Sequence, residues 1–116
     1  MSLQSLLEKI RTQPQAVEFS EVIAAIDANY DYTPSRFSNG SQINEAGSNE
    51  GSCKIFAFAQ LNQLTEEQTL ACFGNFYRDD VLQNPQGTDH ANIRNFMASG
   101  WGGITFDSAP LAARAH

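Results

Sequence analysis

Hydrophobic residues recur at helical spacing at the start of the chain. One apolar stripe at positions i, i+3, i+4 and i+7 predicts a helix over residues 2–12: Leu3, Leu6, Leu7 and Ile10. Pro14 ends this helix. A second helix is predicted over about residues 17–29, with Ser20 as the cap of a shorter alternative. The residues expected on its buried face are Phe19, Val22, Ile23 and Ile26.

Residues 30–40 lack helical periodicity. Pro34 is incompatible with a helix interior, and Asn39-Gly40 is a strong turn signal. We therefore expect a short strand over residues 36–38 with Phe37 pointing inward, followed by a turn. Residues 104–106 read as a second short strand and as the candidate partner of the first.

The most apolar stretch of the chain is residues 55–61. Ser52 could cap a helix over residues 53–62 that has almost no polar face and is therefore expected at the centre of the domain. The alternative is a buried strand, because Phe56 and Phe58 alternate with alanines. Those alanines and the absence of valine favour the helix.

Thr65 and Gln68 match the capping-box pattern, and the apolar spacing that follows predicts one helix from residue 65 to about residue 82. Another helix begins after Thr88 or Asp89 and stops at Gly100. Residues 101–103 are expected to form a loop, and the chain is expected to fray from residue 110 onward. The elements together predict one compact, mostly helical α+β domain over residues 1–116, with about five helices and two or a few short strands.

Charge and composition exclude several classes of function. The 116-residue chain is 41% hydrophobic and has a net charge of −6, with no cluster of Lys or Arg. A chain of this charge repels phosphate backbones and anionic bilayers, so neither nucleic acid nor membrane is an expected partner. The sequence has no secretory signal and no apolar run of about 18 residues, which predicts a cytoplasmic protein. Its two cysteines form no C-x-x-C pair and fit reduced thiols.

A polar, glycine-rich loop precedes the central apolar stretch, and its side chains are the main candidates for a binding site. If the last long helix packs on this loop, two groups of polar residues meet in one cleft: Asn44, Asn49, Glu50 and Lys54 from the loop, and Asp89, His90 and Arg94 from the helix start. Such a cleft would suit a small polar ligand or a segment of a partner protein. The alternative is that these charges pair internally, as Glu50 and Lys54 can at i, i+4. The sequence does not determine the oligomeric state.

A cysteine-dependent hydrolase or transferase is the alternative function. Cys53 would lie at the first turn of the central helix, where free N–H groups favour the thiolate. His90 could act as its base, with Asp89, Asn92 or Asn95 to orient the ring. Against this, free cysteines are commonly buried and inert, so the structural interpretation of Cys53 is favoured.

Neither a metal nor a cofactor is expected. His90 and the scattered carboxylates show none of the ligand spacings of zinc or EF-hand sites. The pair Gly47 and Gly51 lacks the lysine and the strand–loop–helix context of a phosphate-binding P-loop.

Several segments together resemble the HopJ type III effector family. They are Phe37–Gly40, Asn44, Asn49–Ala59, Thr69–Gly74, Tyr77–Leu82, Asp89–Arg94 and Gly100–Trp101, and the resemblance extends from about residue 6 to residue 111. It implies a small single-domain bacterial protein with no assigned activity, so it supplies no catalytic residues. The family name implies delivery through a type III system. The sequence shows no flexible, Ser-rich export segment before the first predicted helix, which makes a binding or regulatory role inside the cell equally consistent.

Overall fold

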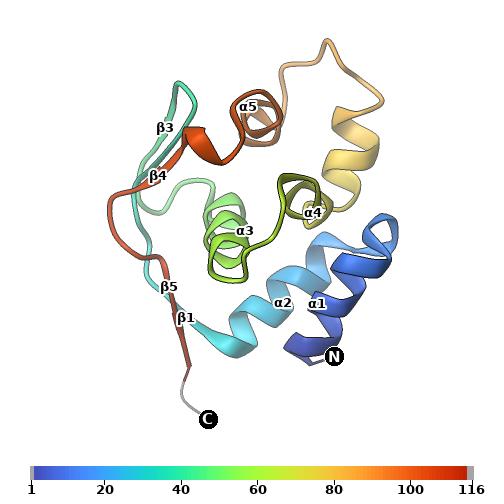
Figure 1. Cartoon of the computed structure of the whole chain (residues 1–116). Helices are drawn as coiled ribbons and strands as arrows, with labels where there is room; N and C mark the ends of the chain where they lie inside the picture. The colour runs from blue at the N-terminus through green and yellow to red at the C-terminus, as the bar shows by residue number, and fades with distance from the viewer. Residues whose placement is uncertain (1, 115–116) are drawn as a thin grey trace.

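Helix α3 (Glu50–Leu61) occupies the centre of the molecule, and the other elements pack around it (Figure 1). The computed structural model describes residues 2–114. Helices α1 and α2 cover one side of α3, α4 and α5 cover another, and two small sheets lie along the remaining side. The other helices are α1 (Leu3–Thr12), α2 (Phe19–Asn29), α4 (Glu66–Ala71) and α5 (Ala91–Ser99), with short helical segments η1 (Pro14–Ala16), η2 (Phe76–Val81) and η3 (Gly100–Gly103). The predicted α+β class is confirmed, and the described part of the chain has five α-helices where about five were predicted.

The central apolar stretch is helical, as predicted, and the strand alternative is wrong. Cys53 and every residue from Ile55 to Ala59 are buried. In a strand, alternate side chains point to opposite faces of the sheet. In α3, the consecutive residues Ile55 to Ala59 are all buried, so the helix is surrounded on all sides there. The helix begins at Glu50 rather than at Cys53, because Asn49 and not Ser52 occupies the N-cap position.

Helices α1 and α2 follow their predicted apolar stripes. The Ser2 hydroxyl accepts a hydrogen bond from the backbone of Ser5 and caps α1. Helix α2 starts slightly later than expected, since Glu18 and Glu21 form a reciprocal capping box just before and inside its first turn. The shorter alternative capped by Ser20 is therefore wrong.

The single helix predicted over residues 65–82 is interrupted. Its capping box at Thr65 is confirmed, but α4 ends at Ala71 and the chain continues as the π-helical segment η2. Gly74, with φ +59°, lies at the break, and a Cβ there would be 2.7 Å from the backbone nitrogen of Phe19. The close approach of the start of α2 leaves no room for a Cβ, and the left-handed backbone conformation independently favours glycine at this point.

Helix α5 also begins differently from the prediction. Its N-cap is His90, in the left-handed conformation with φ 51°, and not Thr88 or Asp89. Gly100 ends the helix with φ +61°, as expected of a C-terminal glycine. The loop expected at residues 101–103 is a turn of 3-10 helix, η3.

Within residues 2–114, five short strands form two antiparallel sheets. In the larger one, β2 (Phe37–Asn39) lies between β3 (Gln42–Asn44) and β4 (Ile104–Phe106), and Phe37 faces Phe106 in the register. The predicted pairing of these two segments is confirmed. In the smaller sheet, β1 (Tyr30–Tyr32) pairs with β5 (Leu111–Ala113). The expectation that residues from 110 onward fray is wrong over β5, and residues 115–116 lie outside the described part.

Aromatic side chains join the helices to the larger sheet. The buried ring of Phe56 has four aromatic neighbours, with centroid distances of 5.0 Å to Phe96, 5.5 Å to Phe73, 6.1 Å to Phe37 and 6.4 Å to Trp101. This cluster fixes α3 relative to α4, α5 and β2. Among residues 2–114, no helix has both the length and the apolar run needed to span a bilayer.

Candidate ligand-binding pocket

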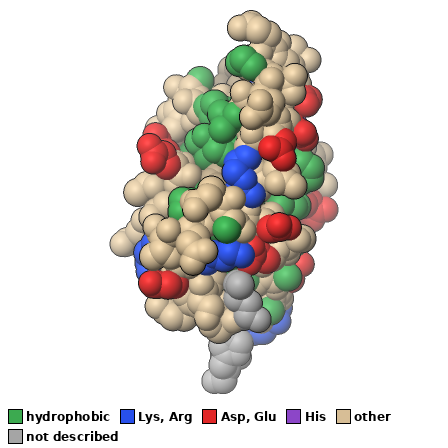
Figure 2. Space-filling model, turned by 90° about the vertical axis from the view of Figure 1, so that its right-hand side faces the viewer, with side chains coloured by type: hydrophobic (Ala, Val, Ile, Leu, Met, Phe, Trp, Pro, Cys, Tyr) green, Lys and Arg blue, Asp and Glu red, His purple; other side chains and the backbone are tan. Residues whose placement is uncertain are grey.

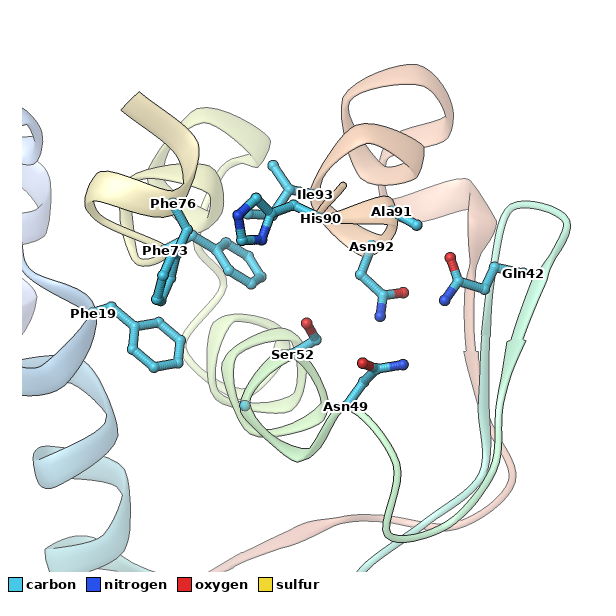
Figure 3. Close-up of a pocket in the computed structure, with 11 residues that line it drawn as sticks. Phe19, Gln42, Asn49, Ser52, Phe73, Phe76, His90, Ala91, Asn92 and Ile93 are labelled. Atoms are coloured by element: carbon cyan, nitrogen blue, oxygen red, sulfur yellow. The ribbon is translucent and has the colours of Figure 1, made fainter. Parts of the chain in front are cut away.

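A cavity of about 360 Å³ lies where the first turns of α3 and α5 approach the start of α2 and the segment η2. Figure 3 shows that its two sides differ in chemistry. Phenylalanine rings form one side, and amide side chains form the other, while Ser52 and His90 lie between them. The apolar side consists of Phe19, Phe73 and Phe76, and the amide side consists of Gln42, Asn49 and Asn92.

Both helices that open onto the cavity begin without a side-chain cap. Their N-cap residues, Asn49 and His90, have φ values of 52° and 51°, and neither side chain bonds to its own helix. The first backbone N–H groups of a helix have no acceptor within it. In α5 the Ile93 N–H bonds to the His90 oxygen at 3.0 Å, and among the described residues the earlier N–H groups of both first turns remain available to a ligand. The positive ends of two helix dipoles thus point toward one small space.

A network of buried amides fixes the polar side of the cavity. The Asn44 Oδ1 atom accepts hydrogen bonds from Asn49 at 2.7 Å, Gln42 at 3.0 Å and Asn92 at 3.0 Å. In turn, Asn92 Oδ1 accepts from Asn39 at 3.0 Å and from Asn44 at 3.2 Å. These bonds tie the β2–β3 hairpin to the starts of α3 and α5. The positions of Asn49 and Asn92 at the cavity are therefore fixed by hydrogen bonds to other amides of the network.

His90 connects the cavity to η2. Its Nε2 atom lies 2.9 Å from Asp80 Oδ2, and its ring lies 5.2 Å from that of Phe76. Asp89 is farther from the ring, at 3.8 Å, and is paired instead with Arg94 at 2.7 Å. This Arg94 guanidinium, through its hydrogen bond, lowers the pKa of the Asp89 carboxyl. The Arg94–Asp89 pair thus ties the loop before α5 to the helix, and neither residue lines the cavity.

Glu50 and Lys54 lie on a different face of α3. Lys54 Nζ is 2.9 Å from Asp27 Oδ1 and 4.9 Å from the centre of the Tyr32 ring. Burial raises the pKa of the Tyr32 hydroxyl, and the nearby Cys53 and Glu50 side chains raise it further. Of the seven residues predicted for one cleft, the structure places Asn49 and His90 at the cavity and Asn44 behind it, while the other four are engaged elsewhere.

Cys53 does not have the surroundings of a catalytic thiol. Its side chain is 1% exposed, and its sulfur contacts the backbone oxygen of Ser35 at 3.9 Å. Burial raises the pKa of the Cys53 thiol, which disfavours the thiolate. The predicted base, His90, is bonded to Asp80 and not to this sulfur. The two conditions of the cysteine-enzyme alternative, an accessible sulfur and a neighbouring histidine, are not met.

We expect both thiols to resist alkylation in the folded protein. Cys72 is fully buried, and burial raises its thiol pKa to about 12, so both sulfurs are inaccessible and protonated near neutral pH. Treatment with iodoacetamide at pH 8, followed by mass spectrometry, should show no modification within minutes, and two modifications in 6 M guanidinium chloride. Rapid labelling of Cys53 alone in the native protein would contradict its buried placement.

Several residues at the cavity were not among the predicted binding residues. Ser52 and Asn92 lie within segments that carry the family resemblance, so the sequence held a signal for them. Phe19 and Phe76 resembled ordinary core residues, yet Phe76 is 40% exposed. Among residues 2–114, no group of three His, Cys, Asp or Glu side chains is placed to hold a metal ion.

The fold and the cavity define a small α+β protein with an amide-lined pocket at two helix starts. The chain belongs to the family described as HopJ type III effector protein, whose model matches residues 3–111. It is similar to a solved crystal structure of VPA0580, a protein of unknown function, with 53% identity and a TM-score of 0.97 over 98% of this chain and 95% of that chain. Comparison with curated proteins gives no match.

Proposed function

We propose that this HopJ-family protein is a binding protein whose ligand occupies the cavity between the first turns of α3 and α5. The observation that carries the proposal is the convergence of two uncapped helix starts on a cavity with one aromatic and one amide side. A volume of about 360 Å³ is at the small end of the range for ligand sites. A ligand bound there would give the protein a regulatory or interaction role.

The lining suggests which ligand groups fit. An apolar or aromatic group would pack against Phe19 and Phe76, where it would also cover the exposed part of the Phe76 ring. A hydrogen-bond acceptor, such as a carboxylate or an amide oxygen, would meet the Ser52 hydroxyl and the free N–H groups. A small polar ligand or the end of a peptide that combines both groups is therefore the expected occupant.

Filling the cavity tests the proposal. A Cβ at Gly51 would lie 3.0 Å from the edge of the Phe19 ring, so Gly51→Val places side-chain atoms inside the cavity. We expect a fragment library of aromatic carboxylates and amides to shift the backbone NMR signals of residues 49–52 and 90–93. The same fragments should lose at least tenfold in affinity for Gly51→Val.

The matched control is Gly102→Val, because a Cβ at Gly102 meets no atom within 4 Å. This variant should bind the fragments like the unmodified protein, and circular dichroism should show that both variants are folded. Fragments that bind Gly51→Val with unchanged affinity, or that shift only signals far from the cavity, would refute the proposed site.

The family description supports a second proposal about where binding occurs. It names type III effectors, so a host protein or host metabolite is one source of the ligand. A translocation reporter fused to the C-terminus, in a strain with an active type III system and in its secretion-deficient mutant, tests delivery. Equal reporter signals from the two strains would restrict the binding role to the bacterial cell.

A further inference from the structure

A second hollow, separate from the cavity, runs between the end of α1, helix α4 and segment η2. It measures about 630 Å³, and we call it the arginine groove because Arg11 and Arg78 line it. Pro14, Tyr77 and Leu82 supply its exposed apolar surface, and the buried Ile10 and Ala71 lie beneath it. Figure 2 shows this side of the molecule, where hydrophobic side chains gather with both Lys or Arg and Asp or Glu beside them.

The apolar surface continues beyond the groove. Leu82 also lines a neighbouring hollow together with Met97 and Pro85. Leu82 and Met97 are each 46% exposed, although both are large hydrophobic residues. A continuous apolar strip of this kind, rimmed by polar residues, is typical of a surface that another chain covers. The strip does not belong to the cavity at the starts of α3 and α5.

Charge indicates what kind of chain would cover it. Among the described residues, neither Arg11 nor Arg78 is paired with a carboxylate. Arg78 donates instead to the backbone oxygens of Val17 at 2.7 Å and Pro14 at 3.3 Å, which holds its guanidinium in place. Glu67 also lines the groove, so the titratable lining has two positive charges and one negative, a net charge of +1 in a chain of net charge −6.

We infer that the arginine groove is a docking site for an amphipathic segment of a partner protein that carries carboxylates beside its apolar face. Leucine-like side chains of the partner would fill the groove over Tyr77 and Leu82, in the manner of a helix in a hydrophobic groove. Aspartate or glutamate at its rim would meet Arg11 and the exposed part of Arg78, since guanidinium groups bind carboxylates with directed hydrogen bonds. An acidic protein has few arginines that can pair with a partner, so the contacts to Arg11 and Arg78 would also fix the orientation of the bound segment.

A random 16-residue peptide display library, selected on the immobilised full-length protein, tests the inference. We expect enriched peptides to carry apolar residues at i, i+3 or i+4, and i+7 together with Asp or Glu. In fluorescence anisotropy, the selected peptides should lose about tenfold or more in affinity for Arg11→Glu and for Leu82→Ser. They should bind Arg11→Lys with a smaller loss.

The matched control is Leu61→Ser, a leucine that is 56% exposed on another face, and it should leave the affinity unchanged. Failure to enrich any peptide, enrichment without acidic residues, or equal binding to Arg11→Glu would overturn the inference. A dimer of the protein itself in light scattering, lost in Leu82→Ser, would overturn it in favour of a second copy as the occupant. The cavity-filling Gly51→Val variant should bind these peptides normally, which separates this test from that of the proposed function.

Discussion

Replacement of Phe56 by alanine is expected to lower the free energy of unfolding by about 3–5 kcal/mol. Phe56 is fully buried in the central helix and touches the rings of Phe37, Phe73, Phe96 and Trp101. Alanine would remove the apolar surface of one ring and leave a cavity surrounded by four others, which cannot all move inward. A loss of this size is a large part of the roughly 5–15 kcal/mol that stabilises a domain.

Urea unfolding followed by circular dichroism and by Trp101 fluorescence measures this effect. The control is Leu61→Ala at the end of the same helix, where the side chain is 56% exposed and the expected change is within about 0.5 kcal/mol. If Phe56→Ala were no more destabilising than Leu61→Ala, α3 would not be the centre of the core.

Replacement of Asn44 by leucine is expected to cost about 2–3 kcal/mol, although leucine has the same branched shape and the same number of side-chain heavy atoms. The change removes the oxygen that accepts bonds from Gln42, Asn49 and Asn92. Gln42 and Asn49 can turn toward water, but the buried Asn92 amide would keep an unsatisfied donor. Such a donor retains the full desolvation cost of a buried polar group.

The same urea titration measures this loss, and Gln86→Leu, which replaces an exposed amide in a loop, serves as the control. We also expect the backbone NMR signals of residues 49–52 and 90–93 to shift in Asn44→Leu, because the amide network holds both helix starts. Stability equal to that of Gln86→Leu, with unchanged signals at the cavity, would show that the network does not shape the site.

The two proposed surfaces divide the molecule by function. The cavity is small, polar on one side and formed by rigid helix starts, which suits a small ligand. The arginine groove is larger, has an apolar floor and is formed partly by the π-helical segment η2. Since η2 also carries Phe76 and Asp80 toward the cavity, it lies between the two sites.

The predictions that succeeded depend on local patterns. The stripe of α1, the capping box at Thr65 and the stop at Gly100 each involve residues within about one or two turns of each other. The pairing of the Phe37 segment with residues 104–106 is a contact between distant segments that the sequence also indicates. The break of the helix at Gly74 is not predicted, and the backbone of Phe19 that approaches Gly74 is far away in sequence.

Local sequence patterns are sufficient to predict the α+β class, about five helices and the central position of α3. Which polar residues meet depends instead on how the helices pack. Asn49 and Glu50 are adjacent in sequence, yet Asn49 lines the cavity and Glu50 does not. Cys53 likewise follows Ser52 but turns into the core. Because successive residues of a helix point in directions about 100° apart, a functional assignment at the start of α3 depends on the helix rotation that packing around Phe56 imposes.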